Sequence, residues 1–279
     1  MPDSAKPTSQ IVVVDGLRLH LLRSGSAARP CVVLVHGGCA NLHWWDDLTG
    51  AIGSGFHVLA VDLRGHGDSQ HSLPPAYAIA DYSRDLLAIL DHFDIDEACF
   101  VGHSLGGIIA ANLAVTAPQR VSRLALIDSQ ARLSPASVHY LTRLRAFPAF
   151  SYPSLEQAVQ RFRLLPKQTA ARHERVQDLA AHSVRRNAAG MWCTKFDRET
   201  LAQLHPMDLV PGLRGLAHPT LLMRGEHSAV LPRDRFEHLL VELPSAYGVE
   251  IAGAYHHVML DNPSACERAL RPFLNQLTR

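Results

Sequence analysis

Ser104 lies in a segment whose residue types would make a serine nucleophilic. The sequence GHSLG at positions 102–106 follows an apolar run at 99–101 and precedes a stretch from 107 to 117 that is rich in small residues. A G-x-S-x-G pattern between a strand and a helix is a nucleophile elbow, a tight turn that holds the serine hydroxyl above the sheet. The simpler interpretation is a glycine-containing turn with a solvated serine. The strand before and the helix after favour a catalytic Ser104.

A histidine near the end of the chain has the chemistry of the matching base. His256 and His257 follow a predicted strand at 248–252 and precede a predicted helix at 264–277. Open α/β sheets bind their ligands at the carboxyl edge, so we expect His256 to lie near Ser104. A neutral imidazole there would take the serine proton and return it to the leaving group. The simpler interpretation of His257 is a loop histidine that packs against or caps the next segment.

Two backbone amides are candidates for an oxyanion hole, which needs two donors directed at the developing negative charge. Leu105 begins the helix after the serine, so its amide is one of them. His36-Gly37-Gly38 ends an earlier buried strand, and the glycines allow the backbone to approach a substrate closely. We therefore predict the amide of Gly38 as the second donor, with the Cys39 amide as the nearby alternative.

The elements that must position these groups alternate along the chain. After a predicted hairpin at 11–22, apolar strands and amphipathic helices follow one another. The predicted strands lie at 31–35, 57–62, 99–101, 121–127, 220–223 and 248–252. One predicted helix begins near Trp44, and the others cover 81–93, 107–117, 233–243 and 264–277. This alternation predicts an α/β fold with a parallel, doubly wound sheet and right-handed crossovers.

The alternation stops between Ser129 and about Pro211. We predict helices at 140–147, 155–165 and 170–187 in this arginine-rich segment and no strand. The chain is therefore expected to form a core domain from residues 1–128 and 212–279, with residues 129–211 as a helical cap over the carboxyl edge of the sheet.

The cap and the loop that contains Gly38 and Cys39, which we call the oxyanion loop, are expected to line a substrate pocket. Some candidates are apolar or aromatic residues, and others are neighbours of the predicted catalytic groups. They are Cys39, Trp44, Trp45, His103, Leu141, Leu144, Phe147, Phe150, Phe162, Trp192 and His257. The two tryptophans and the cap residues would serve equally well as packing residues. Their apolar bias predicts a small-molecule substrate with an apolar or aromatic portion.

Composition limits the class of protein. Among 279 residues, 27 Lys and Arg nearly balance 26 Asp and Glu, which indicates neither a nucleic-acid nor a membrane partner. The 17 histidines show no metal-ligand spacing, and the five cysteines form no C-x-x-C, so no metal or disulfide framework is expected. The polar stretch at 1–10 does not resemble a signal peptide, and no apolar run approaches the ~20 residues that span a bilayer. We expect a soluble, reduced, cytoplasmic protein, and the sequence does not indicate its oligomeric state.

Four motifs together resemble the α/β-hydrolase family. They are HGG at 36–38, DLRGHGDS at 62–69, GHSLGG at 102–107 and GAYHHVMLDNP at 253–263, in the order that the family uses. The resemblance implies an eight-stranded, mostly parallel sheet, a helical cap after the sixth strand, and a Ser-Asp-His triad in chain order. In the family the histidine stands seven residues before a proline, so Pro263 selects His256 over His257. The DLRGHGDS segment corresponds to a structural turn, in which Arg64, His66 and Asp68 would pack the loop.

The acid departs from the usual family pattern. Most members carry it after the seventh strand in a segment like G-x-x-D, but here that segment reads GEHS at 225–228. Other members carry it after the sixth strand, which in this chain is Asp128. The resemblance therefore implies Asp128 as the acid that orients the imidazole, with Glu226 as the alternative. Asp234, or a Ser-His dyad without an acid, remains open, as does a simple capping role for Asp128.

The resemblance implies a serine hydrolase that cleaves an ester-like bond without a metal or organic cofactor. Carboxylesterase is the default, and lactonase, thioesterase and carbon–carbon hydrolase use the same triad. A serine at position 104 argues against haloalkane dehalogenases and epoxide hydrolases, which use an aspartate there. Two alternatives remain: a cofactor-independent dioxygenase that uses a His-Asp pair, and a non-catalytic ligand-binding member of the fold.

Overall fold

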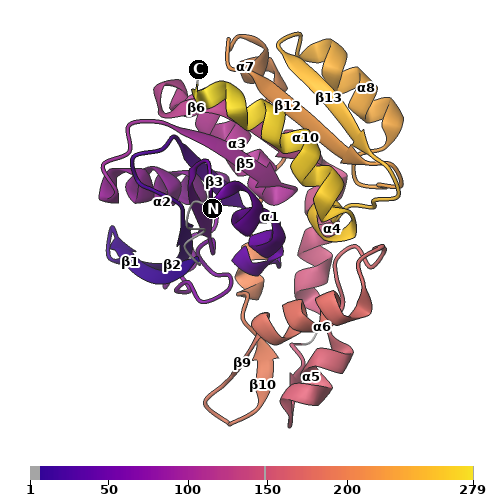
Figure 1. Cartoon of the computed structure of the whole chain (residues 1–279). Coiled ribbons are helices and arrows are strands. Elements are labelled where there is room, and N and C mark those ends of the chain that lie inside the picture. The colour runs from indigo at the N-terminus through magenta and orange to yellow at the C-terminus, as the bar shows by residue number, and fades with distance from the viewer. Residues whose placement is uncertain (1–6, 148, 279) are drawn as a thin grey trace.

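An eight-stranded sheet forms the centre of the computed structural model, which describes residues 7–147 and 149–278 (Figure 1). The strand order across the sheet is β1-β2-β4-β3-β5-β6-β12-β13. These strands are β1 (Thr8–Val14), β2 (Leu17–Ser24), β3 (Cys31–Val35), β4 (His57–Val61), β5 (Ala98–His103), β6 (Val121–Ile127), β12 (Thr220–Gly225) and β13 (Ala246–Ile251). β2 is antiparallel to both β1 and β4, and every neighbouring pair from β4 to β13 is parallel. The predicted eight-stranded, mostly parallel sheet is confirmed.

β1 and β2 form the predicted hairpin. Asp15 and Gly16 join them with φ angles of 49° and 77°. Two successive positive φ values are typical of the type I′ turn, whose twist matches that of the strands it connects. The hairpin therefore adds two antiparallel strands to an otherwise parallel sheet.

Helices cover both faces of the sheet, and this explains why its inner strands are apolar throughout. In β3, Val33 and Val35 face one core cluster, whereas Val32 and Leu34 face the other. The first cluster includes side chains of α2 (Ile79–His92), α3 (Leu105–Thr116) and α8 (Arg233–Glu242), and the second includes α1 (Asp46–Ile52) and α10 (Pro263–Asn275). Strands buried on both faces show continuous hydrophobic runs rather than alternation.

Short helical segments are also present outside the segment between β6 and β12. They are η1 (Leu42–Trp45), η2 (Pro118–Arg120), α9 (Val258–Asp261) and η4 (Gln276–Thr278). The helix expected to begin near Trp44 is thus a 3-10 turn that continues into α1.

The segment between β6 and β12 leaves the sheet, and we use the name cap for its residues 129–211. Its elements are β7 (Arg132–Leu133), α4 (Pro135–Ala146), β8 (Ser151–Tyr152), α5 (Leu155–Arg161), α6 (His173–His182), β9 (Val184–Arg186), β10 (Trp192–Thr194), η3 (Arg198–Leu201) and β11 (Met207–Asp208). α7 (Val210–Arg214) leads back to the sheet. In Figure 1, α5, α6, β9 and β10 project together away from the sheet.

The expectation of a cap without strands was wrong. β8, β10 and β9 form a three-stranded sheet, and β7 pairs with β11. Strands of two or three residues are too short to show a hydrophobic period, so the sequence cannot reveal them. All three predicted cap helices also differ in their boundaries. α4 begins early, where Ser134 accepts a hydrogen bond from the Ser137 amide, and α5 ends at Arg161 because Phe162 is extended. α6 is shorter than the helix predicted at 170–187, and residues 184–186 of that prediction form β9.

No helix in the described ranges is long and apolar enough to cross a membrane. Residues 1–6 of the polar N-terminal stretch lie outside those ranges.

Candidate active site

Ser104 occupies a strained turn between β5 and α3. Its φ of 51° and ψ of −115° fall in a region of backbone conformation that residues other than glycine rarely adopt. The flanking glycines are required by contact: a Cβ at Gly102 would lie 2.3 Å from the Gly106 carbonyl oxygen, and one at Gly106 would lie 2.1 Å from the Val35 carbonyl oxygen. Such strain persists only where the surrounding structure holds it, and it is common at active sites.

Asp128 contacts His256 at the carboxyl edge of the sheet. The distance from His256 Nδ1 to Asp128 Oδ2 is 2.6 Å, and both side chains are buried. The Asp128 carboxylate also accepts hydrogen bonds from the Gly225 amide at 3.1 Å and the Ser228 hydroxyl at 2.6 Å. These three donors hold the carboxylate in one orientation. An imidazole that donates from Nδ1 to a carboxylate keeps its Nε2 lone pair free for a proton.

His103 and His257 pack against His256 with different partners. His103 Nε2 donates to the His256 carbonyl oxygen at 2.9 Å, and the two ring centroids are 4.6 Å apart. His257 Nε2 instead donates to the Pro166 carbonyl oxygen of the cap at 2.8 Å. Burial, with the charge of His256 acting in the same direction, lowers the pKa of His257 to about 3 and the pKa of His103 well below its usual range. Both rings are therefore neutral neighbours of His256 near pH 7.

Ser104 and His256 are linked through His103, the residue that precedes Ser104 and contacts the backbone of His256. Among the hydrogen bonds of the described residues there is none from the Ser104 hydroxyl. Hydrogen bonds between a nucleophile and its base often tighten only when substrate binds. The pairing of these two side chains stays a prediction.

The amides of Gly38 and Leu105, the two predicted oxyanion donors, donate no hydrogen bond within the described ranges. A Cβ at Gly38 would lie 3.6 Å from Leu105 Cδ2, so the two residues are in contact. The Cys39 amide, the alternative donor, is already used, because it donates to His66 Nε2 at 3.2 Å. This difference favours Gly38 over Cys39.

Histidines and an aspartate hold the oxyanion loop in place. His36 Nδ1 donates to the Gly37 carbonyl oxygen at 2.7 Å, and His36 Nε2 accepts the Leu63 amide at 3.1 Å. Burial lowers the pKa of His66 to about 3, which keeps its Nε2 an acceptor for Cys39 near pH 7. Asp62 accepts the Leu42 amide at 2.7 Å.

The DLRGHGDS segment has mainly structural contacts. Its Arg64 forms a buried ion pair with Asp85, and its Asp68 accepts a hydrogen bond from Lys195 of the cap at 2.7 Å. Together with the contact of His66 to the oxyanion loop, these bonds match the loop-packing role that the resemblance implies for Arg64, His66 and Asp68.

Neither of the other candidate acids contacts His256 in the described ranges. Glu226 is exposed, and its carboxylate accepts the Gly253 amide at 2.8 Å. That hydrogen bond lowers the pKa of Glu226. Asp234 is exposed in the first turn of α8.

Two groups in the described ranges bring possible metal ligands within 4.8 Å of one another. One consists of His103, His256 and His257, and the other of His20, Asp62 and Asp68. In the first group His256 Nδ1 already donates to Asp128, and in the second His20 Nδ1 contacts Asp62 at 2.7 Å. In the first group, however, Nδ1 of His103 and Nδ1 of His257 are buried without a hydrogen-bond partner in the described ranges.

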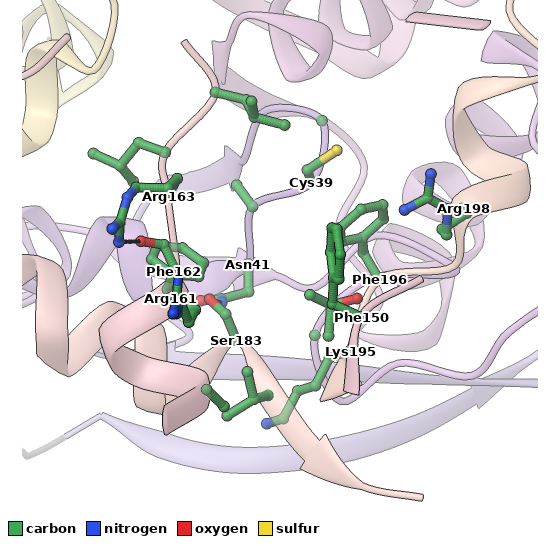
Figure 2. Close-up of a pocket in the computed structure, with 18 of the residues that line it drawn as sticks. Cys39, Asn41, Phe150, Arg161, Phe162, Arg163, Ser183, Lys195, Phe196 and Arg198 are labelled. Atoms are coloured by element: carbon green, nitrogen blue, oxygen red, sulfur yellow. Dashed lines mark hydrogen bonds between the residues drawn. The ribbon is translucent and has the colours of Figure 1, made fainter. Parts of the chain in front are cut away.

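A cavity lies between the oxyanion loop and the cap (Figure 2). Its lining residues come from the loop and from several cap elements: Gly38, Cys39, Ala40, Asn41, Trp44, Gly67, Phe150, Tyr152, Ala158, Arg161, Phe162, Arg163, Leu164, Leu165, Ser183, Val184, Thr194, Lys195, Phe196 and Arg198. Asn41 donates to the Ser183 hydroxyl at 2.9 Å, which ties the loop to the cap. The cavity therefore adjoins the proposed oxyanion hole at Gly38.

The predicted pocket residues divide into two groups. Cys39, Trp44, Phe150 and Phe162 line the cavity, whereas seven others do not: Trp45, His103, Leu141, Leu144, Phe147, Trp192 and His257. Their contacts explain the difference. Trp45 is buried in the core, Leu141 packs against the other core cluster, Phe147 is 60% exposed, and Arg186 stacks on Trp192.

Sequence reasoning missed two features of this region. Ser228, the hydroxyl donor to Asp128, lies in the GEHS segment at 225–228, for which the sequence predicts only Glu226 as a site residue. The cavity also carries four cationic side chains, from Arg161, Arg163, Lys195 and Arg198. The frequency of arginine in the cap was the only available signal for them.

Comparison with known proteins decides the family. A family model described as alpha/beta hydrolase fold matches residues 30–263. The chain belongs to the α/β-hydrolase fold family. This α/β hydrolase is 31% identical over 251 residues to the putative carbamate hydrolase RutD of Pseudomonas syringae pv. syringae (strain B728a), a match that covers 89% of this chain and 95% of the relative. It is 29% identical over 254 residues to the esterase YbfF of Escherichia coli (strain K12), covering 88% and 92% of the two chains.

Solved structures of other α/β hydrolases superpose on this one over nearly its whole length. The crystal structure of E-2-(acetamidomethylene)succinate hydrolase covers 96% of this chain and 99% of its own, with a TM-score of 0.83 and 23% identity. The esterase Rv0045c from Mycobacterium tuberculosis has a TM-score of 0.76 and 27% identity, covering 98% and 92%. The first of these likenesses concerns the fold alone.

Proposed function

We propose that this α/β hydrolase is a serine hydrolase that cleaves an ester-like bond in a small substrate. The observation that carries the proposal is the 2.6 Å contact between buried His256 and Asp128, next to the strained turn of Ser104. An imidazole oriented by a carboxylate is the base that a serine nucleophile requires. The two unbonded amides of Gly38 and Leu105 supply the donors that the oxyanion requires.

The proposed reaction has two halves. Ser104 Oγ attacks the substrate carbonyl carbon while His256 Nε2 takes the serine proton, and the carbonyl oxygen becomes an anion bound by the two amides. The tetrahedral intermediate collapses, the bond to the alcohol breaks, and the alcohol leaves with the proton from His256. Water then attacks the acyl-enzyme with His256 as its base, and the second collapse releases the acid and restores the Ser104 hydroxyl.

An ester is the default substrate because the relatives include a named esterase and a named carbamate hydrolase, whose reactions both begin at a carbonyl. Lactones, thioesters and ketones open to carbon–carbon cleavage would meet the same groups. The aromatic side chains Phe150, Phe162 and Phe196 of the cavity support a substrate with an apolar or aromatic portion.

The dioxygenase alternative relies on the same His256–Asp128 pair, and a non-catalytic binder would need neither. A binding site needs no pair of unbonded amides beside a strained serine turn, and this favours hydrolysis over binding. The relatives named above are also hydrolases by name.

Turnover of p-nitrophenyl esters tests the proposal. The wild-type protein is expected to hydrolyse p-nitrophenyl acetate and butyrate, and Ser104→Ala is expected to reduce kcat by at least ~10⁴-fold because the nucleophile is lost. Equal thermal unfolding curves would show that the variant folds. Unchanged turnover in folded Ser104→Ala would contradict the proposal.

A further inference from the structure

The cavity beside the oxyanion loop has a one-sided charge. Its lining residues include four cations and, within the described ranges, no aspartate or glutamate. The charge of Lys195 is paired with a carboxylate outside the cavity, because its Nζ lies 2.7 Å from Asp68, which does not line the cavity. The three arginines have no such partner: neither Arg161, Arg163 nor Arg198 forms an ion pair with a described residue. A net positive charge therefore faces the space in which a substrate would lie.

Arg198 is the best placed of the three. It begins η3 and is only partly exposed. Its Nη2 donates to the carbonyl oxygens of Leu144 and Arg145, each at 2.6 Å. These carbonyls fix the guanidinium but do not neutralise it. Arg145 itself shows the contrast, since its guanidinium pairs with Glu199 at 2.7 Å.

The position of Arg198 relates it to the catalytic groups. Burial raises the pKa of the Cys39 thiol to about 12, and the positive charge of Arg198 acts in the opposite direction. Arg198 is thus close enough to influence the residue that follows Gly38. Figure 2 shows Arg198 on the side of Phe150 and Phe196, with Arg161 and Arg163 on the other side.

We propose that the cavity selects an ester that carries a carboxylate, which pairs with the Arg198 guanidinium. This inference rests on the proposed hydrolase function and names the substrate class for the same site. A half-buried guanidinium that is already held by backbone carbonyls loses little side-chain freedom on binding. Its Nη2 is used by those carbonyls, so Nε and Nη1 remain to donate charge-assisted hydrogen bonds to a carboxylate. The aromatic rings beside it fit the carbon chain or ring between the carboxylate and the ester. Arg161 and Arg163 add to the positive potential from the opposite wall.

Matched ester pairs test the proposal. One series places the carboxylate on the acyl side, as mono-p-nitrophenyl succinate, glutarate and adipate. The other places it on the alcohol side, as 3-acetoxybenzoate and 4-acetoxybenzoate. Each compound is compared with its methyl ester, which lacks the charge and is larger by one methyl group. We expect kcat/KM for the carboxylate to exceed that of its neutral partner by about 10-fold to 100-fold in at least one series, the scale of a charge-assisted hydrogen bond.

Variants of Arg198 show whether that preference comes from this side chain. Arg198→Gln is expected to raise KM for the charged ester and to abolish the preference, so that kcat/KM for the two members of each pair becomes equal within about twofold. Arg198→Lys should retain part of the preference, because it keeps the charge but loses the planar guanidinium that the two carbonyls hold. The control is Arg84→Gln, which removes an exposed arginine that pairs with Asp81 on α2, outside the cavity. It should behave as wild type.

Two further readouts separate this inference from the proposed function. A fluorophosphonate probe reports whether Ser104 is nucleophilic, whatever the ester. Calorimetric binding of glutarate and adipate dianions to Ser104→Ala, with and without Arg198→Gln, reports anion binding without turnover. A labelled Ser104 together with no carboxylate preference, or a preference that survives Arg198→Gln, would overturn the inference and leave the hydrolase proposal intact. If Ser104 is not labelled, dianion binding that depends on Arg198 would support the anion site, and its absence would refute it.

Discussion

The core and the cap hold their functional side chains in different ways. Asp128 in the core is fully buried, and its carboxylate accepts hydrogen bonds from an amide, a hydroxyl and an imidazole. Arg198 in the cap is partly exposed and rests on two backbone carbonyls, and Arg161 is exposed. A buried network in which every polar group is hydrogen-bonded has one geometry. An exposed cationic residue can instead be replaced with little loss of folding stability. We infer that the core sets the reaction and that the cap sets the choice of substrate.

The largest expected effect follows from removing the charge of Asp128. Asp128→Asn keeps the shape of the side chain but no longer fixes the imidazole with Nδ1–H directed at a carboxylate. We expect kcat for a p-nitrophenyl ester to fall by about 10⁴-fold, the scale known for this change in serine proteases. Steady-state kinetics on folded protein, checked by circular dichroism, would measure it. Activity equal to wild type would show that Asp128 only caps the segment that follows β6.

Buried neutral histidines on the core side make the fold sensitive to acid. His66 and His257 have pKa values of about 3 in the folded protein, because burial disfavours their charged forms, against the ordinary 6.5. Between these pH values the unfolded chain binds more protons than the folded chain, so the free energy of unfolding falls as the pH drops from 6.5 towards 3. Each ring contributes up to about 1.4 kcal/mol per pH unit in this window.

Urea unfolding at pH 7 and pH 5 measures this loss of stability. His257→Asn should remove one contribution and make the stability less dependent on pH. A free energy of unfolding that does not change between pH 7 and pH 5 would contradict the neutral, buried state of these rings.

The next effect tests how the carboxylate is held. Ser228→Ala removes the hydroxyl that donates to Asp128 at 2.6 Å. A hydrogen bond to a charged group contributes about 1.5–3 kcal/mol, so we expect roughly a tenfold loss in kcat and lower stability. Ser129→Ala is the matched control, because the Ser129 hydroxyl is buried without a partner in the described ranges. Equal kinetics for the two variants would show that Ser228 does not position the acid.

A cap substitution should alter substrate binding and leave the chemistry unchanged. Phe196 lines the cavity, whereas Phe147 is exposed and does not. Phe196→Ala is expected to raise KM for aromatic esters about threefold to tenfold, since a ring contact contributes about 0.5–1.5 kcal/mol beyond area burial. Labelling of Ser104 by a small fluorophosphonate should stay at the wild-type rate. Phe147→Ala should change neither, and a fall in labelling for Phe196→Ala would contradict the division between core and cap.

The smallest effect concerns the rejected acid. Glu226 is exposed and accepts the Gly253 amide, and it forms no hydrogen bond or ion pair with His256 in the described ranges. Glu226→Gln should change kcat/KM less than about twofold in the same p-nitrophenyl assay, because the hydrogen bond to Gly253 can be kept by the amide oxygen. A loss as large as that of Asp128→Asn would transfer the role of acid to Glu226.

The core could be predicted from the sequence because its signals are local. Apolar runs mark strands buried on both faces, and the G-x-S-x-G motif is a contiguous pattern with glycines two residues before and after the serine. The cap could be predicted only in part. Its strands of two or three residues depend on pairing partners that lie far apart in the chain, as β7 and β11 do.

Long-range contacts also decide the details of the site. The choice of Gly38 over Cys39 depends on His66, which accepts the Cys39 amide from 27 positions along the chain. The hydroxyl of Ser228 lies beside Asp128 only in the folded chain. Likewise, only the fold brings the charge of Arg198 near Cys39 of the oxyanion loop. A single sequence contains no distance information from which these pairings follow.

The most direct test of the central claim is covalent labelling of Ser104. The purified protein is treated with a fluorophosphonate, and intact-mass and peptide mass spectrometry locate the adduct. We expect one adduct per chain, on Ser104, absent in Ser104→Ala and much slower to form in Asp128→Asn. Folded wild-type protein that acquires no adduct on Ser104 would contradict that claim.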